Sequence, residues 1–203
     1  SSYIKKIKII HHCRNPLIKS LFLKINLKLA DYLIVISKFV KKTFEDHRFI
    51  DNVKLIYDNF KVIEGNSKNK KYQKIKKIGF FGNYKPSKRP LFFLAICNKL
   101  LSDSKNFKFI YVGKINTKEK REIKKNFPNV YDKLQVIDHT FKPNNVIKQL
   151  DLLICPSVDE GFGRLPLEAA SLGVLSLVSN QGGHKEYINR GFCINCKTDD
   201  LDD

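Results

Sequence analysis

Short, mostly apolar runs alternate with amphipathic segments along most of the chain. From about residue 78 onward, apolar runs of four to six residues, the length of a buried strand, are separated by longer segments that we interpret as helices. We predict strands at residues 78–81, 107–112, 134–137, 152–155 and 174–178, and helices at residues 90–101, 118–126, 144–150 and 165–172. This alternation is typical of βαβ units and predicts an α/β fold, in which helices cover both faces of a parallel sheet.

The first third of the chain carries the same two patterns. Apolar residues at three- and four-residue steps predict a helix over residues 17–33, and Ser37 is a suitable cap for a second helix over residues 38–46. Short strands are expected at residues 33–36 and 53–57. The polar stretch at residues 64–77, which is rich in lysine, predicts an exposed linker.

The loops that follow the strands are the places to look for a binding site, because ligands of open parallel sheets bind just beyond the carboxyl ends of the strands. These loops begin at Gly82, Gly113, Asp138, Pro156 and Ser179. The stretch at residues 156–186 predicts a strand end, a glycine loop, a helix, a strand and a second glycine turn. Gly161 and Gly163 would let the backbone approach a ligand closely, and the amides of the following helix N-terminus would attract an anion such as a diphosphate.

Two carboxylates flank this anion site. Glu160 precedes the predicted helix and Glu168 lies on it. Carboxylates do not belong beside a phosphate unless they bind something else, and sugar hydroxyls are their natural partners. The pattern therefore indicates hydroxyl groups as well as a diphosphate in the ligand.

Composition argues against two classes of protein. Of the 203 residues 42% are hydrophobic, enough for a packed core, so the chain is not a disordered tail. No apolar run approaches the ~18–20 residues of a membrane span, which argues against an integral membrane protein. The chain begins with Ser and holds no Met, so we expect a processed or excised piece of a longer protein.

The net charge of +18 is unevenly distributed. Residues 1–130 contain 31 basic and 9 acidic residues, whereas residues 131–203 contain 7 basic and 11 acidic residues. Such an excess suggests an anionic partner, such as nucleic acid, a membrane surface or a phosphorylated ligand. A general drift of composition toward lysine explains the same excess without a partner. Nucleic acid is disfavoured because residues 61–77 offer only Tyr72 as a stacking aromatic.

The five cysteines do not indicate a disulfide framework, since their number is odd, and we expect reduced thiols. Cys193 and Cys196 form a C-x-x-C pair without the second pair that a zinc site needs. The acidic residues at positions 199, 200, 202 and 203 are interpreted as the start of a helix rather than as a metal-binding D-x-D motif. No metal site is therefore predicted.

The segment EGFGRLPLE, residues 160–168, resembles the E-x7-E motif of retaining nucleotide-sugar glycosyltransferases of family 4, which have the GT-B fold. Five other segments are similar to segments of that family, in the same order: ADYLIVISKFVKKTF (30–44), LIYDNF (55–60), IGFFGNYKPSKRP (78–90), FIYVGK (109–114) and GGHKE (182–186). The resemblance implies two Rossmann-like domains. Residues 1–59 would be the end of the N-terminal domain with the interdomain stretch, and residues 60–203 the donor-binding domain, truncated at its C-terminus.

The resemblance also implies a site. Glu160 and Lys88 would be the catalytic residues: Glu160 binds hydroxyls of the donor sugar, and Lys88 neutralises the leaving diphosphate, so that neither a metal nor another cofactor is needed. Glu168 would hold the ribose hydroxyls. The implied donor-binding residues are Gly82, Asn83, Lys88, Gly113, His139, Ser157, Glu160, Gly161, Phe162, Gly163 and Glu168. The implied reaction is substitution at the anomeric carbon with retention, with electrostatic stabilisation of the leaving group.

One position departs from the family pattern. The family usually has Arg directly after the first glycine of the loop at residues 82–90, and this chain has Asn83. Lys85 or Arg89 would have to replace the missing charge, although neither occupies the matching position. We therefore expect a weaker diphosphate clamp at this loop.

The expected partners are a nucleotide sugar with UDP or GDP as its carrier and a glycan or lipid-linked acceptor. The expected location is the cytoplasm, with peripheral contact to an anionic membrane where the acceptor is lipid-linked. Because most of the domain that would supply the acceptor site is absent, we expect donor binding without efficient turnover. Two alternatives stay open: a GT-B relative with other sugar-nucleotide chemistry, such as an epimerase, and a basic module that binds a membrane or nucleic acid.

Overall fold

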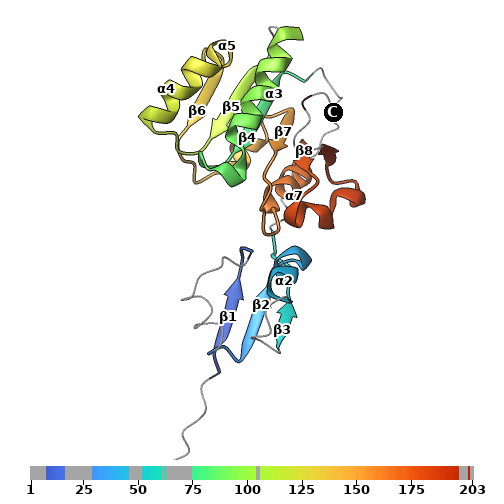
Figure 1. Ribbon diagram of the computed structural model, residues 1–203. Coiled ribbons are helices and arrows are strands. Elements are labelled where there is room, and N and C mark those ends of the chain that lie inside the picture. The colour runs from blue at the N-terminus through green and yellow to red at the C-terminus, as the bar shows by residue number, and fades with distance from the viewer. Residues whose placement is uncertain are drawn as a thin grey trace, which may run out of the picture.

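The computed structural model describes residues 8–16, 29–45, 52–60, 62, 75–103, 106–196 and 201. Within these residues the strands form two parallel sheets, one of three strands and one of six (Figure 1). Helices pack on both faces of the larger sheet. The predicted α/β class with Rossmann-like parallel sheets is therefore confirmed.

The small sheet comes from the N-terminal part of the chain. Its parallel strands lie side by side in chain order: β1 (Ile10–Cys13), β2 (Tyr32–Val35) and β3 (Val53–Leu55). Helix α2 (Lys38–Glu45) follows β2. The Ser37 hydroxyl accepts a hydrogen bond from the Val40 amide at 2.9 Å, so Ser37 is the helix cap that the sequence predicts.

Most predicted elements of this region are found within two residues of the expected bounds, namely α2, β2 and β3. The apolar pattern does not predict β1, because His11 and His12 interrupt it. The predicted helix over residues 17–33 lies largely outside the described residues, but it is wrong at its last five positions: none of residues 29–33 is helical, and the last two belong to β2. Most of the predicted linker at residues 64–77 also lies outside the described residues, and its last residue belongs to β4.

The large sheet has the strand order β6-β5-β4-β7-β8-β9, and neighbouring strands are parallel. Its strands are β4 (Lys77–Phe81), β5 (Lys108–Val112), β6 (Leu134–Ile137), β7 (Leu152–Cys155), β8 (Leu175–Ser179) and β9 (Ile194–Cys196). Its α-helices are α3 (Pro90–Asp103), α4 (Thr117–Asn126), α5 (Pro128–Tyr131), α6 (Pro143–Ile147) and α7 (Arg164–Ser171). The loops contain the 3₁₀ helices η1 (Pro86–Lys88), η2 (Gly182–Glu186) and η3 (Ile188–Arg190).

This strand order has a switch point between β4 and β7. The chain runs outward from β4 to β5 and β6, returns to β7 beside β4, and then runs outward in the other direction to β8 and β9. The loops after β4 and β7 therefore leave the sheet side by side and diverge. In open α/β sheets a ligand crevice forms at such a point, beyond the carboxyl ends of the strands.

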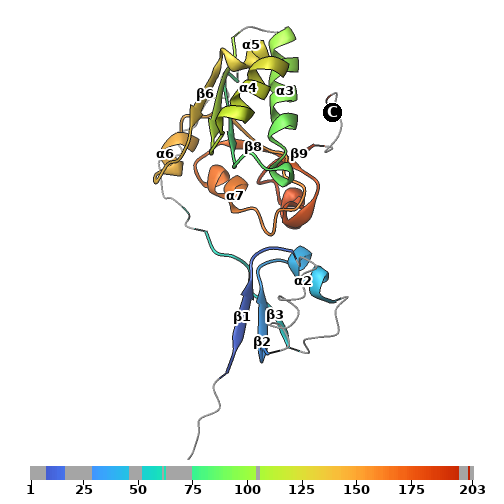
Figure 2. The same ribbon diagram turned by 60° about the vertical axis from the view of Figure 1, so that its left-hand side comes forward.

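The core of the large sheet has two layers, because alternate strand residues point to opposite faces. Figure 2 shows helices α3 and α6 on different sides of the strands. On one face Phe80 and Tyr111 pack with Phe93 of α3; the ring centroid of Phe80 lies 5.1 Å from that of Phe93 and 4.8 Å from that of Tyr111. On the other face Ile110 and Leu153 pack with α6 and α7. Burial of both faces is what the nearly continuous apolar runs predict.

The predicted strands of the large sheet agree with β4 to β8 within one residue. The predicted helices agree with α3, α4 and α7 within two residues, whereas α6 begins one residue and ends three residues before its predicted bounds. The pattern does not predict α5 and β9, which have only four and three residues and so lack a measurable period. Among the described helices, none is both long and apolar enough to cross a membrane.

The two sheets meet through loops. The carboxyl ends of β1–β3 point toward the loop after β7 (Figure 1). The Ser37 hydroxyl donates to the Gly161 carbonyl at 2.5 Å, and the Phe39 amide of α2 donates to the Glu186 carboxylate at 3.0 Å. Apolar residues from both sides, including Val35 and Phe162, share one buried cluster. The predicted boundary at residues 59–60 lies between β3 and β4, and the division into two domains stays a prediction.

Candidate functional site

The loops after β4 and β7 are in contact at the switch point. The first runs through η1 to Lys88, and the second comprises residues 156–163. The Val158 amide donates a hydrogen bond to the Ser87 carbonyl at 3.1 Å. This bond fixes the two loops side by side, and it places the end of η1 next to the glycine loop.

Lys88 and Glu160 form an ion pair where these two loops meet. The Lys88 Nζ lies 2.5 Å from the Glu160 Oε2, and their side chains are 35% and 24% exposed. A pair in this intermediate environment is screened less than a surface pair, yet it stays open to an incoming polar ligand. The structure thus brings together the two residues to which the resemblance assigns catalysis, and their roles stay predictions.

The second glycine turn packs against the first glycine loop. The Gly183 amide donates to the Glu160 carbonyl at 2.8 Å. A Cβ atom on Gly183 would lie 2.4 Å from the Gly161 carbonyl oxygen, so only glycine allows this approach. The two glycine-rich segments therefore form one unit that supports the backbone around Glu160.

The N-terminus of α7 directly follows the loop that carries Glu160. Gly163 occupies its N-cap position with φ +78°, and no side chain in the described part of the chain caps the helix. The Gly163 carbonyl accepts a hydrogen bond from the Tyr187 hydroxyl at 2.6 Å, and Phe162 lies buried against the rings of Tyr57 and Tyr187. The Tyr187 hydrogen bond and the aromatic contacts thus fix the loop. The first backbone amides of α7 have no side-chain cap and could donate hydrogen bonds to an anion.

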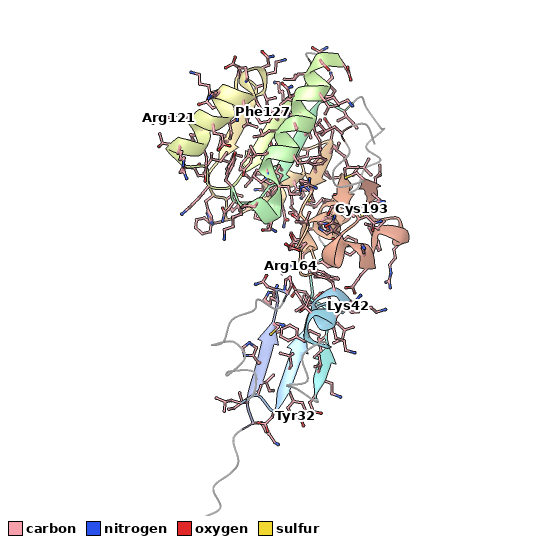
Figure 3. All side chains as sticks on the ribbon, viewed as in Figure 1. Tyr32, Lys42, Arg121, Phe127, Arg164 and Cys193 are labelled. Carbon is pink, nitrogen blue, oxygen red and sulfur yellow. The ribbon has the colours of Figure 1, made fainter. Side chains whose placement is uncertain are left out.

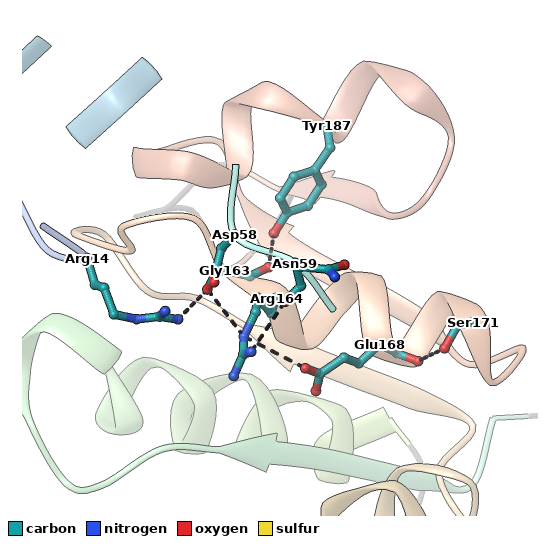
Figure 4. Close-up of polar contacts among 8 residues, drawn as sticks. All are labelled: Arg14, Asp58, Asn59, Gly163, Arg164, Glu168, Ser171 and Tyr187. Atoms are coloured by element: carbon teal, nitrogen blue, oxygen red, sulfur yellow. Dashed lines mark hydrogen bonds and ion pairs between the residues drawn. The ribbon is translucent and has the colours of Figure 1, made fainter. Parts of the chain in front are cut away.

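Glu168 has a different cationic neighbour from Glu160. It lies one turn after Arg164 on α7, and the Arg164 Nε is 3.9 Å from the Glu168 Oε1 (Figure 4). The Glu168 side chain is 21% exposed. The two carboxylates of the E-x7-E segment therefore each have a cation of their own, which lets them face different parts of one ligand.

Gly82, Asn83 and Gly113 hold the loops after β4 and β5 together. The Asn83 side-chain oxygen accepts a hydrogen bond from the Lys114 amide at 3.2 Å. A Cβ atom on Gly113 would lie 2.1 Å from the Gly82 carbonyl oxygen. These contacts explain the residue types at the three positions by packing and hydrogen bonding alone, independently of any contact with a donor.

Arg89 does not take up the place of a cation after Gly82. Its guanidinium lies over the ring of Phe92 in α3, 4.4 Å from the ring centroid. Arg89 also has a left-handed backbone with φ 54°, and it is the C-cap residue of η1, immediately before α3. Lys85, the other candidate for the missing charge, is exposed at the start of η1.

His139 and Ser157 differ in their relation to the crevice. His139 is exposed, and its ring packs edge-on against the exposed Phe141, with 4.6 Å between centroids. The structure does not bring it to the Lys88–Glu160 pair. Ser157 is buried at the start of the loop after β7, and its carbonyl accepts a hydrogen bond from the Ser179 hydroxyl.

His184, which the sequence places in the second glycine turn, lies buried behind the glycine loop. Its side chain is 1% exposed, its Nδ1 lies 3.2 Å from the Ser179 hydroxyl, and its ring packs against Gly163. Because the Ser179 hydroxyl donates to a carbonyl, it accepts from His184 Nδ1, which makes Nδ1 the protonated nitrogen of a neutral ring. Burial lowers the pKa of His184 from 6.5 to about 4.

This buried histidine is expected to make the protein less stable in acid. Between pH 6.5 and about 4 the unfolded state binds a proton that the folded state excludes, so stability is lost as the pH falls through this window. We expect a loss of roughly 2–3 kcal/mol between neutral pH and the lower end of the window. Urea unfolding of the parent and of His184→Gln at both pH values measures this loss. The same pH dependence in both proteins would contradict the assignment.

The cysteines and acidic groups offer no metal centre in the described part of the chain. All five cysteines are free thiols, as expected. Among the described residues, no group of three or more His, Cys, Asp or Glu side chains is arranged to hold a metal ion. The acidic residues at positions 199, 200, 202 and 203 lie outside the described residues.

Three charged residues near the site do not emerge from the sequence: Arg14, Asp58 and Arg164. Asp58 accepts a hydrogen bond from Arg14 and pairs with Arg164 at 3.5 Å. Helical spacing could have indicated the pair between Arg164 and Glu168, four residues apart. No local pattern indicates the contacts of Asp58, because its partners come from distant parts of the chain.

Known proteins resemble this chain in fold and in part of its sequence. HepE from Anabaena, in a complex with UDP and glucose, has a TM-score of 0.75 and 17% identity over 96% of this chain and 59% of HepE. A point mutant of TarM from S. aureus, in a complex with fondaparinux, α-GlcNAc-glycerol and UDP, has a TM-score of 0.80 and 15% identity over 98% of this chain and 43% of TarM. At these identities the likeness establishes the fold, which is of the GT-B type.

Sequence comparison identifies the family. Protein CapJ from Staphylococcus aureus is 34% identical over 98 residues, which are 47% of this chain and 25% of CapJ. The chain thus spans between a quarter and three fifths of the length of these relatives. Residues 75–202, more than half of the chain, match the family described as Glycosyl transferases group 1. The expected resemblance to GT-B glycosyltransferases is therefore confirmed, and the chain belongs to the glycosyl transferases group 1 family.

Proposed function

We propose that this chain is the donor-binding part of a glycosyltransferase that moves a sugar from a UDP- or GDP-sugar to an acceptor with retention of configuration. The observation that carries the proposal is the Lys88–Glu160 pair, 2.5 Å apart at the switch point of the sheet. It joins a cation and a hydroxyl-binding carboxylate beside a helix N-terminus, the groups that a sugar diphosphate needs. The UDP found with HepE and with TarM supports a nucleotide as carrier.

In this proposal the two carboxylates bind different parts of the donor. The diphosphate would lie over the first amides of α7 and near the Lys88 ammonium, with the sugar against Glu160 and the ribose against Glu168. When the bond between the anomeric carbon and the diphosphate oxygen breaks, its electron pair stays on that oxygen. Lys88 and the helix amides would stabilise the resulting charge. The acceptor hydroxyl oxygen would form the new bond to the anomeric carbon on the same face, and its proton would pass to the departing diphosphate oxygen.

The remaining predicted residues would shape this site rather than react. Gly161, Phe162 and Gly163 would present backbone amides to the sugar and the diphosphate. Gly82, Asn83, Gly113 and Ser157 would form its walls, and His139 would reach the donor only at the nucleoside end. Because Lys88 and α7 supply positive charge, we propose that donor binding needs neither a metal nor another cofactor.

The acceptor and the location are also proposals. We propose a glycan or lipid-linked acceptor; the α-GlcNAc-glycerol found with TarM supports a saccharide-bearing partner. The five free thiols are compatible with a reducing, cytoplasmic location, and a lipid-linked acceptor would bring the protein to an anionic membrane surface. The basic excess before residue 130 favours such a surface.

Thermal unfolding with a panel of nucleotides tests the proposal. A matching nucleoside diphosphate or its sugar, at about 100 times its Kd, is expected to raise Tm by about 5–10 °C, and addition of EDTA is expected to leave the shift unchanged. Inorganic pyrophosphate is the control for general anion binding. An equal shift by pyrophosphate would favour a basic binding module, and a shift that vanishes with EDTA would contradict metal independence.

A further inference from the structure

A network of four charged side chains joins the small sheet to the candidate donor site. Asp58, in the segment after β3, is only 12% exposed and pairs with two arginines. Arg14 follows β1 of the small sheet, and Arg164 is the first residue of α7, a helix that packs on the large sheet. Figure 3 shows Arg164 in the region between the two sheets. Glu168 completes the network as the second neighbour of Arg164.

Arg164 is shared between two carboxylates. Its Nε lies 3.5 Å from the Asp58 Oδ2 and 3.9 Å from the Glu168 Oε1, and its Nη1 donates to the Asn59 carbonyl at 3.4 Å (Figure 4). Two of these three partners belong to the segment that follows β3. The guanidinium is therefore drawn toward Asp58 and Asn59, and its contact with Glu168 is the longest of the three.

This sharing matters because a free arginine and a carboxylate prefer a two-point pair. Such a pair occupies both carboxylate oxygens and is stronger than a single contact. Glu168 lies one helical turn from Arg164, which is close enough for the pair to form if Arg164 were released. In such a pair the guanidinium takes up one lone pair of each carboxylate oxygen, so the carboxylate is less available to two neighbouring hydroxyls of a ribose.

We propose that Asp58 is a positioning residue, which acts through Arg164 to keep the Glu168 carboxylate oriented and open for the hydroxyls of the donor ribose. This inference rests on the proposed function, since it takes Glu168 as the ribose ligand. Arg14 anchors Asp58 from the side of the small sheet. The position of the small sheet therefore influences nucleotide recognition at a carboxylate that belongs to the large one.

Discrimination between ribose and deoxyribose measures this role. The probes are UDP and GDP with their 2′-deoxy counterparts, titrated by calorimetry at fixed ionic strength into the parent chain and its variants. The parent is expected to prefer the matching ribonucleotide about tenfold, the effect of one hydrogen bond to a carboxylate. Asp58→Asn is expected to reduce this preference to about two- to threefold, with unchanged affinity for inorganic pyrophosphate. Glu168→Gln is expected to reduce it at least as far.

Three further variants separate positioning from a purely structural role. Asp58→Glu keeps the charge and is expected to keep most of the preference. Asp159→Asn removes an exposed carboxylate from the loop after β7 and is expected to change nothing. Arg164→Gln is expected to keep most of the preference, because no guanidinium then remains to close the Glu168 carboxylate. In the double variant Asp58→Asn with Arg164→Gln the preference lost in Asp58→Asn is expected to return, because Asp58 acts through Arg164.

The outcomes distinguish the two proposals. If the parent binds none of the nucleotides, the proposed function fails. If the parent binds and discriminates but Asp58→Asn lowers only Tm and leaves the ribose preference intact, the positioning role is overturned while the donor site stands. A loss in the double variant as large as in Asp58→Asn alone would also overturn it, because it would show that Asp58 acts independently of Arg164.

Discussion

Replacing Lys88 by alanine is expected to lower the affinity for a nucleoside diphosphate about 10- to 100-fold, because the diphosphate loses a charge-assisted contact. The loss is larger than one contact alone would cause, since the Glu160 carboxylate, 2.5 Å from Lys88 Nζ, is then left unpaired and repels the phosphates. In a full-length protein, sugar transfer is expected to fall about 10²- to 10³-fold. Calorimetry with UDP and GDP, followed by a transfer assay, measures both effects.

Two variants serve as controls for this result. Lys85→Ala removes an exposed lysine from the same loop and is expected to change affinity less than about twofold. Combining Lys88→Ala with Glu160→Gln should recover part of the lost affinity, because it removes the repulsive carboxylate. Equal losses in Lys85→Ala and Lys88→Ala would mean that the loop acts only through its total charge, which would contradict the specific role of Lys88.

Replacing Gly113 by alanine is expected to destabilise the fold by about 4 kcal/mol or more. The added methyl group would lie 2.1 Å from the Gly82 carbonyl oxygen, a backbone atom that cannot move without disturbing β4. Gly113 also has φ +153°, a conformation that residues with a side chain rarely adopt. Equilibrium unfolding in urea measures the loss, and nucleotide binding should weaken with it, because the loops after β4 and β5 separate.

Gly191→Ala is the matched control for Gly113→Ala. Gly191 also has a positive φ, +77°, but a Cβ atom there would meet no atom within 4 Å. Its replacement is expected to cost only the conformational strain of about 1–2 kcal/mol. The difference between the two variants isolates the steric contact between the loops. If both variants lost the same stability, backbone conformation alone would explain the effect and the close approach of Gly82 and Gly113 would be irrelevant.

Much of the large sheet can be predicted because its signals are local. A strand buried on both faces needs a short apolar run, as residues 152–155 provide, and a helix over a sheet needs an apolar stripe, as in residues 90–103. Elements that are too short to show a helix or strand periodicity cannot be predicted in this way. The strand β9 and the helix α5 are examples, and β1 escapes because two histidines interrupt it.

Some features of the candidate site can also be predicted from local sequence, and others cannot. Glu160 and Gly163 are close in sequence on one loop, so their proximity is evident from the order of residues alone. The position of the Arg89 guanidinium cannot be predicted in this way. From the sequence alone, Arg89 could supply the positive charge that is missing at Asn83. The structure places its guanidinium over Phe92, where the aromatic face attracts it.

By itself, the sequence determined the α/β class, the order of most strands and helices, and the loop that carries Glu160 and the glycines. These features follow from the periods of strands and helices and from the backbone freedom of glycine, which act over a few residues. The tertiary structure alone decided that Lys88 faces Glu160, that Asp58 shares Arg164 with Glu168, and that His184 is buried and neutral. Charge pairing and desolvation depend on distances and surroundings in space, and parallel strand order brings together loops that are far apart along the chain.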